Sequence, residues 1–219
     1  MTTTVSLGRA AAAFVLLVSL PGAAQAPVPD TLRLGLAGGR FPALTWQQMN
    51  DAQRTMTQSV LDGPRGNLGG PFNVLLRSPE MGDLAQKLGA YARFSPAMPP
   101  KLRELAIIVT ARHWTSQYEW YAHRRAAAQA GLREDIITAI ANRRPPADMQ
   151  PDERTVYDFA TELLETKQVG DANFKAARDL LGEQGVVDVV AVVGYYQMVS
   201  MLLNVDVHPL PDGVAPELK

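Results

Sequence analysis

Residues 98–132 read MPPKLRELAIIVTARHWTSQYEWYAHRRAAAQAGL, and they predict two helices with a short break between them. Ionisable residues stand in unusual places in this stretch. Glu104 adjoins an apolar run at 105–109, and Glu119 and His123 follow, four residues apart. Residues at that spacing share one face of a helix. On a helical wheel this face continues through alanines, so it should pack inward and bury two ionisable groups, which requires a reason.

The remaining charged residues of the stretch have simpler interpretations. Arg124 and Arg125 lie on the opposite face of the second helix and should point to solvent. His113 lies about half a turn from the Glu104 face, so we interpret it as a helix-end residue stabilised by the helix dipole. Glu104 has two open interpretations: a proton relay to His123, or a buried ion pair with an arginine, Arg103 or Arg112.

The chain begins with the features of an export signal. Arg9 is the only charged residue before Asp30, and it precedes the apolar run AAAFVLLVSL and the small-residue site Ala24-Gln25-Ala26. This order predicts a signal peptide at residues 1–26, cleaved after Ala26, and a periplasmic or secreted protein. The apolar run is too short to span a bilayer, which needs about 20 residues. An uncleaved anchor is the alternative.

Composition limits the remaining possibilities. The chain has 219 residues and no internal repeat, which favours one domain, and its net charge of −1 at pH 7 does not suggest a nucleic-acid partner. It has no cysteine, which excludes disulfides, thiol chemistry and thiolate metal ligands.

The hydrophobic pattern predicts an all-α fold of seven or eight helices. Residues 27–44 should form an irregular arm, residues 45–212 the domain and residues 213–219 a tail. Thr45 is the expected cap of the first helix and Ser78 that of the second. The expected helices span 46–60, 79–94, a central pair between 100 and 130, 133–142, 151–167, 171–181 and 185–205. The last is strongly apolar, but its charge-free core is short for a membrane span, and we expect a buried core helix.

Two further regions are expected to contribute to packing or to a site. In the helix at 79–94, the inward residues should be Met81, Leu84, Ala85, Leu88 and Tyr91 or Ala92. Residues 62–73 are rich in glycine and proline and should form a loop. Within it, the glycines before Pro71, Phe72 and Asn73 let backbone approach a ligand. These residues form either a plain turn or, as the resemblance described below implies, one wall of a substrate pocket.

Together these segments resemble a known family. RELAIIVTAR, YEWYAH and AAQAGL, with GGPFNVLLRSPEMGDLAQKLG before them and VVAVVGYYQMVSMLLNVDVHPLP after them, are similar to the carboxymuconolactone decarboxylase family. That family shares its helical fold with alkyl hydroperoxidase D. The resemblance implies a homotrimer or homohexamer with no metal or organic cofactor and a small-molecule substrate.

The resemblance also suggests roles for individual residues. In the peroxidase branch, a glutamate on the first helix pairs with two cysteines and a histidine on the second. Those positions are Glu104, Ser116, Glu119 and His123 in this chain, so both cysteines are replaced. The resemblance therefore implies the cysteine-free branch, which moves protons and does not reduce peroxides.

We interpret Glu119 and His123 as a general acid/base pair, with Glu104 as their relay. The alternatives are a buried hydrogen-bonded pair without a catalytic role, and a metal site, since Glu-x-x-x-His places two ligands on one face. Ser116, Trp120 and His208 are expected to contact substrate together with the pocket wall at 71–73. Arg54 and Arg77 are candidate clamps for a substrate carboxylate.

The sequence thus predicts a cofactor-independent lyase that decarboxylates or isomerises a small carboxylated or lactone substrate. The alternatives are a lactone hydrolase and a non-catalytic ligand-binding or oligomeric scaffold protein. After removal of the signal, no membrane span is expected.

Overall fold

The computed structural model describes Met1, residues 34–94 and residues 98–219. The predicted signal peptide, apart from Met1, and residues 27–33 of the predicted arm lie outside these residues. The described part is all helical and contains no strand, as predicted. Its eight α-helices are α1 (Asp51–Leu61), α2 (Phe72–Leu75), α3 (Pro79–Phe94), α4 (Pro100–His113), α5 (Gln117–Gln129), α6 (Glu134–Ala141), α7 (Pro151–Thr166) and α8 (Asp171–Asp206).

The central pair forms as the sequence predicts. α4 has proline at its first position, and α5 ends before Gly131, whose φ of 92° is favourable for glycine alone. There, Leu132 N donates to Ala127 O and Gly131 N donates to Ala128 O, so two carbonyls of the last turn are satisfied. α4 is buried along nearly its whole length, because it contacts α5, α6, α7 and α8.

The first predicted helix is divided. Thr45 precedes only a 3-10 turn, η2 (Trp46–Gln48), and Met49 is extended. α1 begins at Asp51, where the Asn50 side chain accepts a hydrogen bond from Gln53 N. Asparagine is a strong N-cap, and this explains why the helix starts later than predicted. The predicted loop at 62–73 also ends early, since α2 starts at Phe72.

The inward face predicted for α3 is wrong except at its small residues. Met81, Leu84, Leu88 and Tyr91 are exposed, and Ala85 and Ala92 are buried as predicted. α3 instead packs through Gly82, Ala85, Gly89 and Ala92, because small residues allow close contact. A Cβ on Gly89 would lie 2.1 Å from the Tyr195 ring of α8. Close packing therefore turns the larger apolar residues outward.

α8 combines the last two predicted helices. Gly182 has φ 71° and ψ 176°, so the helix is kinked at that residue, between the two predicted segments. α8 contains the one window in the described part long and apolar enough to cross a membrane, with a mean hydropathy of 1.8. In this window 56% is buried inside the chain, as is typical of a core helix.

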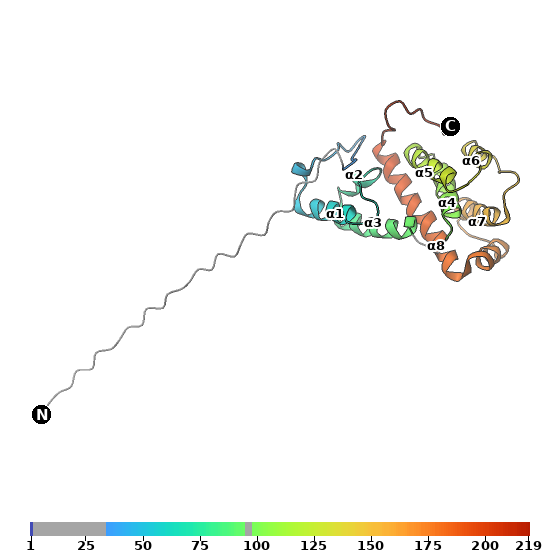
Figure 1. Cartoon of the computed structure of the whole chain (residues 1–219), viewed down its shortest axis with the longest axis horizontal. Coiled ribbons are helices and arrows are strands. Elements are labelled where there is room, and N and C mark those ends of the chain that lie inside the picture. Colours follow the sequence, from blue (N-terminus) through green and yellow to red (C-terminus); the bar gives the residue numbers. More distant parts are fainter. Residues whose placement is uncertain (2–33, 95–97) are drawn as a thin grey trace.

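α8 runs between two groups of helices, α1–α3 on one side and α4–α7 on the other (Figure 1). Each group has its own apolar core. Leu34, α1, α2 and the first half of α3 enclose the smaller core, and α4–α8 enclose the larger one. Met198 of α8 packs against both. The candidate site lies where these two groups face each other.

Candidate active site

The three ionisable residues singled out in the sequence form one continuous row. His123 Nδ1 donates to Glu104 Oε2 at 2.7 Å, and His123 Nε2 lies 3.0 Å from Glu119 Oε1. Glu104 comes from α4, and the other two come from successive turns of α5. All three are buried. The structure thus supports the interpretation in which Glu104 contacts His123. Arg112, one of the two alternative partners, instead donates to Thr115 and Lys219.

The row determines the charge of the histidine. Burial alone lowers the pKa of His123, but the nearby carboxylates of Glu119 and Glu104 outweigh it and raise the pKa to about 9. His123 is therefore an imidazolium at neutral pH, held between two acidic side chains. Both of its ring nitrogens lie within 3.0 Å of a carboxylate oxygen, so the row can hold a proton close to Glu119.

The row ends at a cavity of about 390 Å³. Glu119 and His123 line it, whereas Glu104 lies behind His123 and is not part of the wall. The other walls come from the loop at 64–72, the end of α3 and the middle of α8. We call this space the Glu119 cavity. Its volume falls within the range of small-molecule sites.

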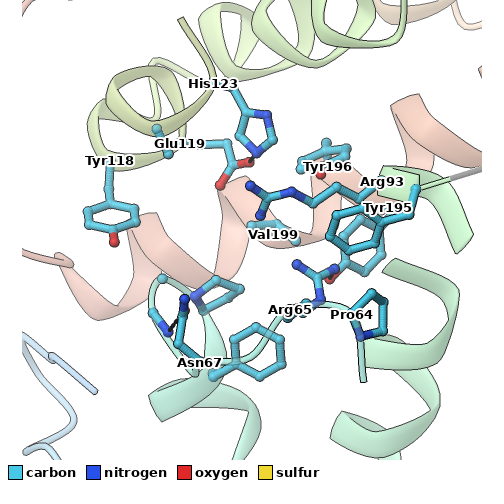
Figure 2. A pocket seen from close by; sticks show the side chains of 16 residues that line it. Pro64, Arg65, Asn67, Arg93, Tyr118, Glu119, His123, Tyr195, Tyr196 and Val199 are labelled. Atoms are coloured by element: carbon cyan, nitrogen blue, oxygen red, sulfur yellow. Dashed lines mark hydrogen bonds and ion pairs between the residues drawn. The ribbon is translucent and has the colours of Figure 1, made fainter. Parts of the chain in front are cut away.

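Two arginines enter this cavity, and neither was predicted. Figure 2 shows the guanidinium groups of Arg65 and Arg93 turned into the same space as the Glu119 carboxylate. Arg54 and Arg77, the predicted clamps, lie outside the cavity wall; Arg54 contacts Asp51, and Arg77 donates to Pro42 O. In the sequence, Arg65 could have been singled out as the one cation in a loop rich in glycine and proline.

Two tyrosines of α8 complete the wall. The Tyr196 ring lies edge-on to His123 with centroids 4.9 Å apart, and burial raises its pKa well above the ordinary value. Its hydroxyl is buried and has no hydrogen-bond partner within the part of the chain that the structure describes. Tyr195 accepts a long hydrogen bond from Arg65 Nη2 at 3.5 Å. Both tyrosines interrupt an apolar run, and that was a usable sequence signal.

The predicted pocket wall is correct in part. Pro71 and Phe72 line the Glu119 cavity, and so does Gly70, whose φ of 73° favours glycine. Asn73 does not line it. Its side chain is buried and joins the arm to α2, donating to Phe41 O at 2.7 Å and accepting from Leu44 N. Asn73 therefore connects the arm to α2 and does not contact the cavity.

The structure also places the other three predicted substrate contacts elsewhere. Trp120 is in the larger core, because its turn of α5 faces the neighbouring helices. Ser116 and His208 line a separate cavity of about 200 Å³. His208 Nδ1 lies 3.1 Å from Asp206 Oδ2, and Asp206 also accepts from the backbone of Gly39 and Phe41. This cluster connects the end of α8 to the arm.

The geometry of the row does not resemble a metal site. Within residues 34–94 and 98–219, no three His, Asp or Glu side chains are arranged to hold an ion. Both His123 nitrogens already lie within 3.0 Å of a carboxylate oxygen. This donor arrangement fits proton exchange better than metal coordination.

Comparison with known families agrees with this geometry. The sequence model of the carboxymuconolactone decarboxylase family matches residues 79–162. The chain carries a domain of this family. A comparison with curated proteins gives no match. The family domain runs from the start of α3 into α7, so it includes Glu104, Ser116, Glu119 and His123. Arg65, Tyr195 and Tyr196 lie outside the matched residues, although they share the cavity with Glu119.

Proposed function

We propose that this protein is a cofactor-independent lyase or isomerase that moves a proton to or from a small carboxylated or lactone substrate. The observation that carries the proposal is the buried row Glu104–His123–Glu119 ending in a cavity that also holds two arginines. The family domain supports an enzyme of this general kind. With no cysteine in its 219 residues, the chain has no thiol for peroxide reduction.

Glu119 is the group that exchanges the proton with substrate. It lines the cavity, and His123 behind it is protonated because its pKa is about 9. In decarboxylation, the bond to the carboxylate carbon breaks and carbon dioxide leaves, while the electron pair enters an enolate. The proton of His123 passes through Glu119 to the substrate carbon, and His123 becomes neutral until solvent restores its proton. In isomerisation, Glu119 removes a proton from one carbon and returns it to another.

Glu104 acts as a positioning residue. Its carboxylate holds His123 Nδ1–H at 2.7 Å and so fixes the orientation of the imidazole. When Glu119 takes a proton from the substrate, as in isomerisation, this second carboxylate beside the ring keeps His123 protonated.

The remaining lining residues suit an anionic, oxygenated substrate. Arg65 and Arg93 provide donors for a carboxylate, and such charge-assisted hydrogen bonds are strong. The free Tyr196 hydroxyl is a donor for the oxygen on which enolate charge develops. Phe72 and Val199 contribute apolar wall around these groups.

The test is a product screen of small carboxylated lactones and unsaturated acids by mass spectrometry. His123→Ala should remove product formation, and Glu80→Gln, which changes an exposed glutamate of α3, should not. Carbon dioxide release identifies a decarboxylase, whereas water addition without carbon dioxide identifies a hydrolase. Ligand binding without any product would support a scaffold protein and contradict the proposal.

We also propose that the chain associates with copies of itself. The support is the exposed apolar face of two neighbouring helices, with Leu84 and Leu88 on α3 and Val187 and Val190 on α8. The helices are joined by Tyr91, whose hydroxyl donates to Asp188 Oδ1 at 2.8 Å. A large exposed apolar patch usually marks an interface.

Light scattering after size-exclusion chromatography tests this association. The wild-type mass should be a multiple of the chain mass, and Leu84→Glu should lower it. Leu180→Glu is the matched control, because Leu180 is also exposed but lies before the Gly182 kink of α8. A monomeric wild type would contradict the proposal.

Export remains part of the proposal. Cleavage after Ala26 would remove the predicted signal peptide at residues 1–26 and leave a mature chain that starts at Pro27. N-terminal sequencing of the protein recovered from a periplasmic extract tests the cleavage site, and an intact N-terminus there would contradict it.

A further inference from the structure

A second cavity of about 390 Å³ lies between α4, α7 and the segment after α6. Val109, Ile140 and Leu164 form its apolar wall. Four arginines also line it: Arg112, Arg143, Arg144 and Arg154. We call it the arginine cavity. It shares no lining residue with the Glu119 cavity.

Arg112 is the buried member of the cluster, with only 5% of its surface exposed. Its Nη1 donates to Thr115 Oγ1 at 3.0 Å and its Nη2 to Lys219 O at 2.5 Å. The Nε atom is buried without a hydrogen-bond partner in the described residues. A buried guanidinium donor without an acceptor is unfavourable, and an anion in the cavity would supply one.

The other arginines are held around Arg112 to different degrees. Arg143 Nη2 donates to the same Thr115 hydroxyl at 3.0 Å, which brings two guanidinium groups together. Arg154 Nη2 donates to Pro146 O, and its Nη1 lies 3.5 Å from Asp158 Oδ1. Arg144 is exposed, and its side chain makes no hydrogen bond or ion pair in the part of the chain described.

The wall of the arginine cavity carries more positive than negative charge. Asp158 and Glu165 are the acidic residues of the wall, against four arginines. His113 is also part of the wall, and its pKa is lowered, first by burial and then by Lys167 and Arg143. The pKa of Arg112 is lowered by burial and by Arg143. Burial is the largest cause of both pKa shifts, and the neighbouring cations act in the same direction.

We propose that the arginine cavity binds a small organic anion, a carboxylate whose apolar body rests on Val109, Ile140 and Leu164. The arginines supply planar donors that match a carboxylate. The apolar wall favours a molecule with a hydrocarbon part over an inorganic ion. This site stands independently of the proposed function, because none of its residues belongs to the Glu119 cavity.

The experiment is calorimetric titration of the full chain with benzoate, with inorganic phosphate and with uncharged benzamide. Benzoate should bind, benzamide should not, and phosphate should bind more weakly than benzoate. Arg144→Ala and Arg143→Ala should each weaken benzoate binding about tenfold, as expected when one charge-assisted contact is lost. The Arg144 side chain is exposed and makes no hydrogen bond within the described residues, so its variant should melt like the wild type.

Two further variants locate the binding. Arg178→Ala, an exposed arginine of α8 outside both cavities, should leave the benzoate affinity unchanged. Arg65→Ala, in the Glu119 cavity, should leave this binding event unchanged too. Loss of all benzoate binding in Arg65→Ala would assign the anion to the Glu119 cavity and overturn the proposal. Phosphate that binds as tightly as benzoate would overturn the organic class, and an absence of benzoate binding would overturn the site.

Discussion

The two cavities have the same volume, about 390 Å³, and each has one histidine in its wall, but the pKa values of the two histidines are shifted in opposite directions. Beside the Glu119 cavity, two carboxylates raise the pKa of His123 to about 9. In the arginine cavity, burial and neighbouring cations lower the pKa of His113. One histidine therefore holds a proton at neutral pH and the other does not.

This difference shows that neither the size of a cavity nor the presence of a histidine indicates its chemistry. Proton exchange requires a charged group at the wall and a second group behind it, as Glu119 and His123 provide. The arginine cavity has donors without a base of this kind, and that arrangement suits binding. The predictions below test each side of the comparison, starting with the largest effect.

Glu119→Gln should lower kcat about a thousandfold on any substrate found by the product screen, because the amide can neither accept nor deliver the proton. The shape of the side chain is kept, so KM should change little. Initial rates and thermal melting are the measurements, with Glu80→Gln as the matched control on α3. Retention of full activity by Glu119→Gln would contradict its assignment as the group that contacts substrate.

The unfolding free energy should fall as pH rises from 6.5 to 9. His123 has a folded-state pKa of about 9 against 6.5 for the free side chain, so the folded state holds a proton that the unfolded state has lost in this window. The contribution of His123 to the unfolding free energy is about 3 kcal/mol. It is fully present below pH 6.5 and absent above pH 9. Urea unfolding at several pH values measures it.

The His123→Gln variant is the control for this pH dependence, because it keeps both carboxylates and removes the titrating ring. Its stability should be nearly constant over the same window. His113 should behave in the opposite sense: its folded pKa is lowered, so its contribution is lost as pH falls below 6.5. Histidine ring resonances followed by NMR as the pH changes distinguish His113 from His123. A His123 ring that titrates near pH 6.5 would contradict the claim that the two carboxylates keep it protonated.

Gly89→Ala should destabilise the fold by about 1–3 kcal/mol, as overpacking typically does. The added Cβ would lie 2.1 Å from the Tyr195 ring, so this wall of the Glu119 cavity must shift. Gly194→Ala is the matched control on α8, since nothing lies within 4 Å of its Cβ position. That change should stabilise the helix by about 1 kcal/mol. Thermal melts of both variants provide the test.

Arg65→Ala should raise KM about tenfold and change kcat less, because the arginine binds the substrate carboxylate before and during reaction. Arg144→Ala should leave the same KM unchanged, since Arg144 belongs to the arginine cavity. Steady-state kinetics of the two variants give the comparison. Equal effects on KM would remove the functional distinction between the cavities.

The row at the candidate site was predictable because its signals are local. Glu119 and His123 are one helical turn apart, so helix geometry alone brings them together. The caps and breaks around α4 and α5 are also local, and the predicted pair forms as expected. The contact of Glu104 with His123 required two helices to pack, and only the family resemblance indicated it in advance.

The predictions that failed depend on contacts between distant segments. The hydrophobic pattern of α3 points Leu84 and Leu88 inward, but glycine and alanine on another face allow closer contact with α8. Arg65 and Tyr196 are 131 positions apart, and nothing in their own segments shows that they face one cavity. Trp120 adjoins Glu119 in the sequence, but its side chain packs in the larger core. Ser116 lies three residues before Glu119, at the N-cap of α5, and lines the separate cavity with His208.

The sequence by itself determined the all-helical fold, the absence of thiol chemistry and the pairing of Glu119 with His123, because composition and helical periodicity act over a few residues. Only the tertiary structure decided which arginines and tyrosines surround that pair and which arginines gather around Arg112. It also decided the charges of His113 and His123. A pKa depends on burial and on charges within a few ångströms, and these are set by packing between segments far apart in the chain.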